Sequence, residues 1–256
     1  MQLRDYQTKA ISDLRLSFKQ GNKSPLLVMP TGSGKTVVFA EISKALESNK
    51  KNVLILVHRK ELVDQASNKL NVVDVDHGII ASGYKGKTNN IQVASVQTLV
   101  RRLDTIDYKP DYIIVDEAHH LSWYPDDPSL KWKAAQALSA QTEGLLLITA
   151  TPRLQGIETQ FGLLNLVDSE RFSSFKEFQE QTKEMKKVAE IAREISLGEV
   201  KEESLKYLKS KFSGSELDEA LAELKESNRS DKLLHNLVDR HGTGRVLIRN
   251  RRERLQ

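Results

Sequence analysis

The sequence predicts an α/β protein with a mostly parallel sheet, followed by a helical segment. Through residue 152, short apolar runs alternate with amphipathic stretches, which is the pattern of β–α units on a parallel sheet. A glycine-rich turn stands directly between an apolar run and a helical stretch. After residue 155, apolar residues recur at helical spacing and no strand–turn–helix unit repeats.

The predicted strands are short apolar runs that end in polar residues. They cover residues 26–30, 52–58, 91–97, 112–117 and 144–151, with a weaker strand near 77–81. Helices are predicted between them, for example over 35–47 and 60–70. Because a parallel sheet binds ligands at the carboxyl ends of its strands, polar motifs at those ends are the candidates for function.

The second part of the chain predicts helices. Apolar residues between 175 and 195 recur at helical spacing, and amphipathic stretches follow near 200–211, 216–226 and 231–240. A short apolar piece at 246–248 closes this part. We therefore expect two domains, a nucleotide-binding domain over residues 1–155 and a helical appendage over residues 156–256.

Composition narrows the class of protein. The chain has 256 residues, a net charge of +4 and no cysteine, which excludes disulfides and thiolate metal sites. Its first residues lack the apolar core of a signal peptide, so we expect a cytoplasmic protein. Arginine is concentrated in residues 240–254, and the positive balance permits binding to nucleic acid.

The strongest motif is Met-Pro-Thr-Gly-Ser-Gly-Lys-Thr at 29–36, directly after an apolar strand and before a helix. Backbone N–H groups in such a turn, aimed by a helix N-terminus, bind phosphate. A lysine there reaches the β- and γ-phosphates of ATP and a hydroxyl reaches Mg²⁺. The pattern thus predicts a P-loop NTPase, with ATP bound by Thr31, Gly32, Ser33, Gly34, Lys35 and Thr36.

A second motif, Ile-Ile-Val-Asp-Glu-Ala-His-His at 113–120, places two carboxylates where a strand ends. Asp116 is predicted to hold Mg²⁺ together with Thr36, and Glu117 to orient and deprotonate the attacking water. An apolar strand that ends in Asp-Glu is also typical of a plain acidic turn. Its combination with Lys35 makes a nucleotide hydrolase the favoured interpretation.

These motifs resemble those of superfamily-2 helicases of the DEAD/DEAH type, whose motor domains are RecA-like. Asp116 to His119 resembles the DEAH box, and Leu-Arg-Asp-Tyr-Gln at 3–7 resembles the motif that reads adenine, which implies that Gln7 contacts the base. The resemblance also implies coupling roles for His119, Thr149 and Thr151. It implies nucleic-acid contacts by residues in the segments 58–65 and 95–98, namely Arg59, Gln97 and Thr98.

The resemblance has two parts. Residues 1–118 are similar to XPB-like and restriction-enzyme-type helicases, and residues 116–256 are similar to the RapA/HepA Swi/Snf-type ATPases associated with RNA polymerase. The second similarity rests on residues 116–123, 145–152, 170–172 and 239–250. It implies a nucleic-acid partner, duplex DNA favoured and RNA possible, and RNA polymerase as a further partner.

The resemblance further implies that full activity needs a second RecA-like domain, which supplies an arginine finger. We therefore expect the first motor domain of a nucleic-acid-dependent ATPase, a helicase or translocase that is weakly active alone. Two alternatives remain open at this point. One is a nucleotide-switched, non-catalytic module docking on RNA polymerase. The other is a small-molecule kinase, which would leave Gln7 and the motifs at 95–98 and 149–152 without a role.

Overall fold

The computed structural model describes residues 3–84, 89–102, 108–150, 156–197, 200–211 and 247–249. The chain divides into two compact units, one formed by residues 1–175 and 245–256 and the other by residues 176–244. Within the described ranges, no helix has the length and apolar character needed to span a bilayer.

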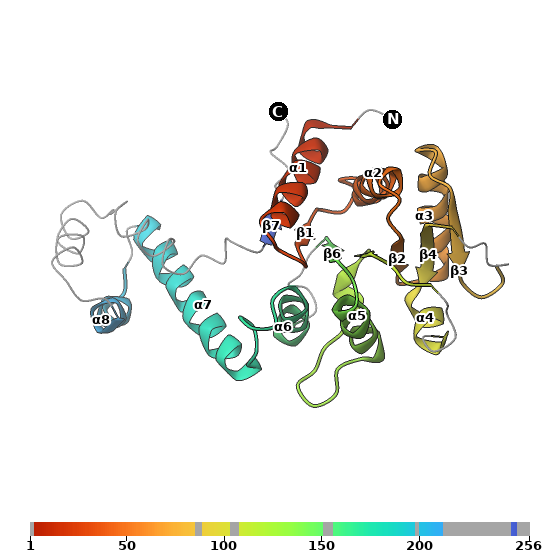
Figure 1. The fold of residues 1–256 in the computed structure, drawn as a ribbon. Helices are drawn as coiled ribbons and strands as arrows, with labels where there is room; N and C mark the ends of the chain where they lie inside the picture. The colour runs from red at the N-terminus through yellow and green to blue at the C-terminus, as the bar shows by residue number, and fades with distance from the viewer. Residues whose placement is uncertain are drawn as a thin grey trace. The chain divides into compact units, whose positions relative to one another are not determined.

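A seven-stranded sheet forms the centre of the first unit, with the strand order β3-β4-β2-β5-β6-β1-β7 (Figure 1). All of its strand pairs are parallel. The fold class predicted from the sequence is therefore confirmed. The strands are β1 (Leu26–Val28), β2 (Val53–Val57), β3 (His77–Ile80), β4 (Ile91–Ser95), β5 (Tyr112–Val115), β6 (Gly144–Thr149) and β7 (Leu247–Arg249).

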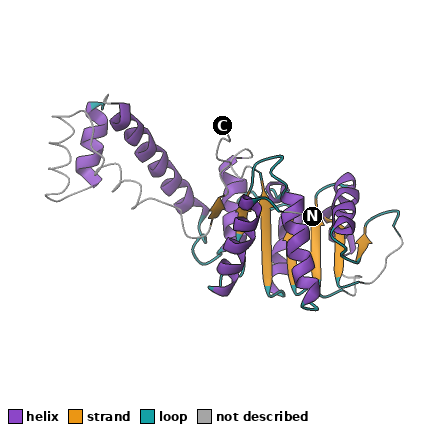
Figure 2. Ribbon diagram, turned by 90° about the horizontal axis from the view of Figure 1, so that it is seen from above, coloured by secondary structure: helices purple, strands orange, loops and turns teal. Residues whose placement is uncertain are grey.

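Helices cover both faces of this sheet (Figure 1). One face carries α1 (Asp5–Lys19), α2 (Lys35–Ser48) and α3 (Lys60–Val72). The other face carries α4 (Val96–Arg102), α5 (Leu130–Ala140) and α6 (Gly156–Val167). Figure 2 shows the strands side by side beneath the first of these layers. Every residue of β2, β4 and β6 is buried, because a parallel sheet covered on both faces hides both sides of its strands.

The observed strands end before the polar residues that the predictions had included. Val96 begins α4 directly after β4, so the predicted strand 91–97 is too long. Glu117, predicted as the last strand residue, adopts a left-handed conformation with φ of 51° and leads into a short 3₁₀ helix, η1 (Ala118–His120). A non-glycine residue in this region is uncommon and often marks a functional turn.

Four aromatic rings attach α6 to the segment after η1. The Trp123 ring packs at a tilt against Phe161, with centroids 4.6 Å apart, and against Phe175 at 5.4 Å, and lies 6.5 Å from Trp132. The indole N–H of Trp132 donates to the carbonyl of Gly162 at 2.8 Å. The compact unit therefore continues past residue 155, where the sequence analysis expected a boundary.

The second unit contains the predicted helices. They are observed as α7 (Phe175–Leu197) and α8 (Glu202–Lys211), linked by a hydrogen bond in which Ser204 Oγ donates to Glu194 Oε2 at 2.7 Å. Ile191 and Ile195, which predicted the amphipathic pattern, are buried. The stretches predicted as helical near 216–226 and 231–240 lie outside the described residues.

Strand β7 was not predicted as part of the sheet. The sequence analysis placed the apolar piece at 246–248 at the end of the helical appendage, whereas the structure pairs Leu247–Arg249 in parallel with β1. The run has only three residues, and a run so short carries no periodicity that separates strand from helix.

Candidate active site

The glycine-rich loop connects the carboxyl end of β1 to the first residue of α2, Lys35. Gly32 and Gly34 have φ of 76° and 82°, a region that only glycine adopts without strain. Among the described residues, no protein acceptor receives the N–H groups of Gly32, Gly34, Lys35 and Thr36. A row of unused donors at the start of a helix fits a phosphate chain.

Gln7 lies behind this loop rather than on its surface. Its side chain is 5% exposed, and both ends of its amide are bonded within the protein. Nε2 donates to the carbonyl of Ser33 at 3.0 Å, and Oε1 accepts from the N–H of Arg4 at 3.0 Å. A Cβ added to Gly34 would collide with Nε2 of Gln7, so the amide and the loop fit closely. The Gln7 amide is thus bound to the loop and to Arg4, and its contact with adenine stays a prediction.

The loop lysine and the strand-end carboxylate meet across the site. Lys35 Nζ lies 3.0 Å from Glu117 Oε1, and both Lys35 and Asp116 are buried. Burial, with the neighbouring charge of Glu117, raises the pKa of Asp116 to about 6, against the opposing effect of Lys35. The environment of Asp116 thus disfavours its ionised form, and a bound cation would stabilise that form.

The predicted coupling residues also meet here. His119 Nδ1 lies 3.2 Å from Glu117 Oε2 and 3.2 Å from Thr149 Oγ1. Thr149 ends β6, the strand between β5 and β1, and its carbonyl accepts from the N–H of Met29 at 2.9 Å. A chain of contacts therefore joins the two motifs to the strand between them. Thr151 lies outside the described residues.

A magnesium ion would find few protein ligands in this site. No group of three His, Asp or Glu side chains arranged for a metal occurs in the described part of the chain. Mg²⁺ is usually held by one or two protein oxygens together with phosphate and water, so Thr36 and Asp116 fit its chemistry.

The predicted nucleic-acid residues lie on the same sheet edge but on other strands. Arg59 is the exposed N-cap of α3 after β2, while Gln97 and Thr98 lie in the first turn of α4 after β4. Strands β2 and β4 are neighbours, with Val57 paired to Ser95. The three residues therefore follow the carboxyl ends of two adjoining strands, and β5 and β6 separate these strands from β1.

Three further side chains lie between these two groups and were not predicted as a site. His58 and His120 stack with ring centroids 3.9 Å apart and planes 12° apart, and His120 is 4.2 Å from His119. Lys131 Nζ lies 3.2 Å from His58 Nδ1. The histidines stood in motifs that the sequence analysis had found, but no pattern pointed to Lys131.

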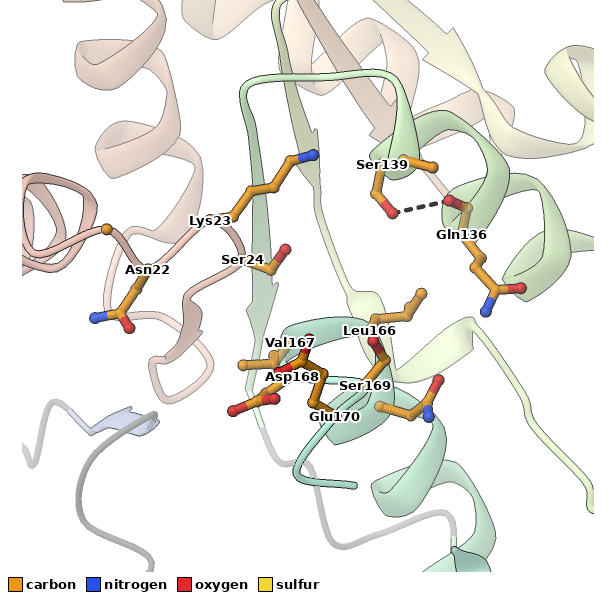
Figure 3. A pocket seen from close by; sticks show the side chains of 13 residues that line it. Asn22, Lys23, Ser24, Gln136, Ser139, Leu166, Val167, Asp168, Ser169 and Glu170 are labelled. Atoms are coloured by element: carbon orange, nitrogen blue, oxygen red, sulfur yellow. Dashed lines mark hydrogen bonds between the residues drawn. The ribbon is translucent and has the colours of Figure 1, made fainter. Parts of the chain in front are cut away.

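A pocket of about 640 Å³ lies at the opposite edge of the sheet (Figure 3). Its lining comes from residues 21–24, which precede β1, from the last turns of α5 and α6, and from residues 168–170, which follow α6. The loop at 29–36 instead follows β1. The pocket is therefore separate from the residues that carry the predicted chemistry.

Comparisons with known proteins agree with this architecture. Residues 1–154 match the family described as "Type III restriction enzyme, res subunit". The RNA polymerase-associated protein RapA of Vibrio cholerae serotype O1 (strain M66-2) is 38% identical over 150 residues, which are 56% of this chain and 16% of that protein. RapA of Photobacterium profundum is 38% identical over 151 residues, with the same two shares covered. The chain thus spans about a sixth of the length of these relatives.

Solved structures share the fold. The Sulfolobus solfataricus SWI2/SNF2 ATPase core in complex with dsDNA has a TM-score of 0.59 at 20% identity, covering 71% of this chain and 39% of that one. The Sulfolobus solfataricus SWI2/SNF2 ATPase core domain, in a second structure, has a TM-score of 0.55 at 20% identity, covering 71% of this chain and 38% of that one. Since the family match extends over more than half of the sequence, the chain belongs to the Type III restriction enzyme res-subunit family and carries a superfamily-2 helicase motor domain.

Proposed function

We propose that this chain is the ATP-binding first motor domain of a nucleic-acid-dependent ATPase, which hydrolyses ATP to ADP and phosphate when paired with a second motor domain. The observation that carries the proposal is the contact of 3.0 Å between Lys35 Nζ and Glu117 Oε1. It brings a phosphate-binding cation and a candidate base together beside the unused N–H groups of the loop.

Each residue has a separate task in this proposal. Lys35 and the unused N–H groups of Gly32, Gly34, Lys35 and Thr36 hold the phosphates. Thr36 and Asp116 hold Mg²⁺, which would neutralise phosphate charge when bound. Glu117 orients the attacking water and accepts its proton. The phosphates give Lys35 a new partner, so Glu117 is released from its ion pair when it is needed as a base.

His119 and Thr149 are proposed to couple the position of Glu117 to the end of strand β6. His119 Nδ1 is equidistant from the Glu117 carboxylate and the Thr149 hydroxyl, at 3.2 Å from each. Burial lowers the pKa of His119, so the ring is neutral at pH 7. A neutral imidazole has only one N–H donor. A change in the position of Glu117 therefore changes the hydrogen bond between His119 and Thr149.

Arg59, Gln97 and Thr98 are proposed to bind the nucleic-acid backbone. Their guanidinium, amide and hydroxyl groups suit phosphate contacts that carry no sequence information. We favour duplex DNA, since the Sulfolobus structure with the same fold is described in complex with dsDNA. Opening and closing of the cleft against a second motor domain would convert these contacts into movement along the strand.

The similarity to RapA favours a second candidate, a nucleotide-switched module that docks on RNA polymerase without hydrolysing ATP. One experiment separates the two. The ATPase rate is measured without polymer and with single-stranded DNA, duplex DNA or RNA, both for residues 1–256 and for the chain joined to a second motor domain. Stimulation by a nucleic acid in the joined protein supports the motor. ATP binding with no stimulation by any polymer supports the docking module.

A further inference from the structure

Lys131 occupies a position between the nucleotide residues and the predicted nucleic-acid residues. It lies in the first turn of α5, and its Nζ is 3.2 Å from Nδ1 of His58, at the carboxyl end of β2. His58 is fixed in turn by its stack on His120 at 3.9 Å. The ammonium group is therefore held at the residue that precedes Arg59 in the chain, and the charge of Arg59 acts on it.

The two cations at this place are not neutralised by the protein. Within the described part of the chain, neither Lys131 nor Arg59 forms an ion pair with a carboxylate, whereas Lys133 on the same helix pairs with Asp127 at 3.1 Å. Burial, and then the charge of Arg59, lower the pKa of Lys131. The repulsion between these two cations costs free energy, and an anion bound by both would offset that cost.

The neighbouring groups also suit an anion. Burial, followed by the charges of His120, Lys131 and Arg59, lowers the pKa of His58 to about 4, so its ring is neutral and can accept from the ammonium. Arg59 is the N-cap of α3, and no side chain caps that helix. The N–H of Leu62 donates to the Arg59 carbonyl at 3.1 Å, whereas the N–H groups of residues 60 and 61 have no acceptor among the described residues, although Glu61 adds a negative charge to this turn.

We propose that Lys131 and Arg59 together bind one backbone phosphate of duplex DNA, with His58 as the residue that positions the Lys131 ammonium. The proposal rests on the function proposed above and adds a contact that lies outside the helicase motifs. Gln97 and Thr98 at the end of the adjoining strand β4 continue the same edge, which favours a polymer over a small free anion.

The test measures binding of residues 1–256 to a short mixed-sequence duplex by fluorescence anisotropy between about 50 and 200 mM salt. Replacing Lys131 by alanine should lower affinity for every sequence and reduce the slope of log K against log salt by about 0.9. Lys131→Arg should restore most of both. Lys133→Ala, which removes the same charge from the same helix, should leave the slope nearly unchanged.

The positioning role of His58 is tested separately, by combining its substitution with that of Lys131. His58→Ala should weaken binding in the unsubstituted background and add little to Lys131→Ala, because both changes remove the same contact. Additive effects would overturn the positioning role.

Failure of the Lys131 contact can be distinguished from failure of the proposed function. If the chain binds duplex DNA with a salt dependence that Lys131→Ala and Lys133→Ala reduce equally, or not at all, the phosphate contact is wrong and the proposed function stands. If the unsubstituted chain shows no salt-dependent binding, the nucleic-acid part of the proposed function fails and the contact fails with it. The affinity for ATP should be the same in all Lys131 variants.

Discussion

At the carboxyl end of the sheet, charged side chains are buried or paired in a first half, formed by β1, β5 and β6. In a second half, formed by β2 and β4, they are exposed and, as far as the structure describes the chain, unpaired. At β1, β5 and β6, Lys35 and Asp116 are buried, and Lys35 is paired with Glu117. At β2 and β4, Arg59 and Gln97 are exposed, and no carboxylate pairs with Arg59 among the described residues. A buried, prearranged set of charges suits one small ligand of fixed shape, whereas open cations suit a polymer that must slide.

The largest expected effect is on hydrolysis in the first half. Glu117→Gln keeps the size of the side chain but removes the base, so the ATPase rate of the chain joined to a second motor domain should fall by about 10²–10⁴. ATP should still bind. Glu170→Gln, an exposed change at the opposite edge of the sheet, is the control. A Glu117→Gln rate equal to the unsubstituted rate would show that Glu117 is not the base.

The next effect is on ATP affinity. Lys35→Ala removes a charged donor to the phosphates, worth about 1.5–3 kcal/mol, so the Kd for Mg-ATP should rise by about 10- to 150-fold. Calorimetry on residues 1–256 measures it. Lys44→Ala, on the exposed side of the same helix, should leave the Kd unchanged. Equal affinities for the two variants would contradict the phosphate site.

The pH dependence of the free energy of unfolding should show the cost of keeping Asp116 ionised in the first half. The folded pKa of Asp116, about 6, lies above its ordinary value of 3.8, so folding favours the protonated form and stability falls as pH rises from about 4 to about 6. Without nucleotide, Asp116→Asn should therefore stabilise the chain by about 1–3 kcal/mol at pH 7 and have little effect at pH 4.

Urea unfolding at the two pH values measures this difference, with Asp126→Asn, an exposed change, as the control. Destabilisation by Asp116→Asn at pH 7 would mean that attraction to Lys35 outweighs the cost of burial.

The smallest effect belongs to the second half. Arg59→Ala should weaken duplex binding by a similar factor for all sequences and lower the salt slope by about 1, with no change in ATP affinity. Arg15→Ala on α1, also exposed, controls for net charge. Strong dependence on sequence would indicate base contacts and would remove the contrast between the two halves.

The sequence was sufficient to predict the sheet and the loop because both depend on local patterns. Buried parallel strands must be apolar throughout, and a phosphate loop must have glycine where φ is positive. Six of the strands, and the positive φ of Gly32 and Gly34, follow from those requirements. The left-handed turn at Glu117 was missed, because glutamate has no local preference for that conformation.

Contacts between distant segments were not predictable in the same way. Lys131 meets His58 only because the start of α5 lies beside the end of β2, and 73 residues separate the two. The environment of Gln7 likewise depends on how α1 approaches the loop, which no motif specifies. Lys131 is an ordinary residue type, and its placement alone gives it a role. The motif at 3–7 marked Gln7 as a site residue but did not predict its hydrogen bond to the Ser33 carbonyl.

The aromatic packing around α6 has a practical consequence for measurement. The chain contains two tryptophans, Trp123 and Trp132, and both are buried in that packing. Residues 176–244 contain none. Intrinsic tryptophan fluorescence therefore reports only on the first unit, whereas circular dichroism records helix in both. Unfolding curves recorded with the two probes would separate wherever the two units lose their structure independently.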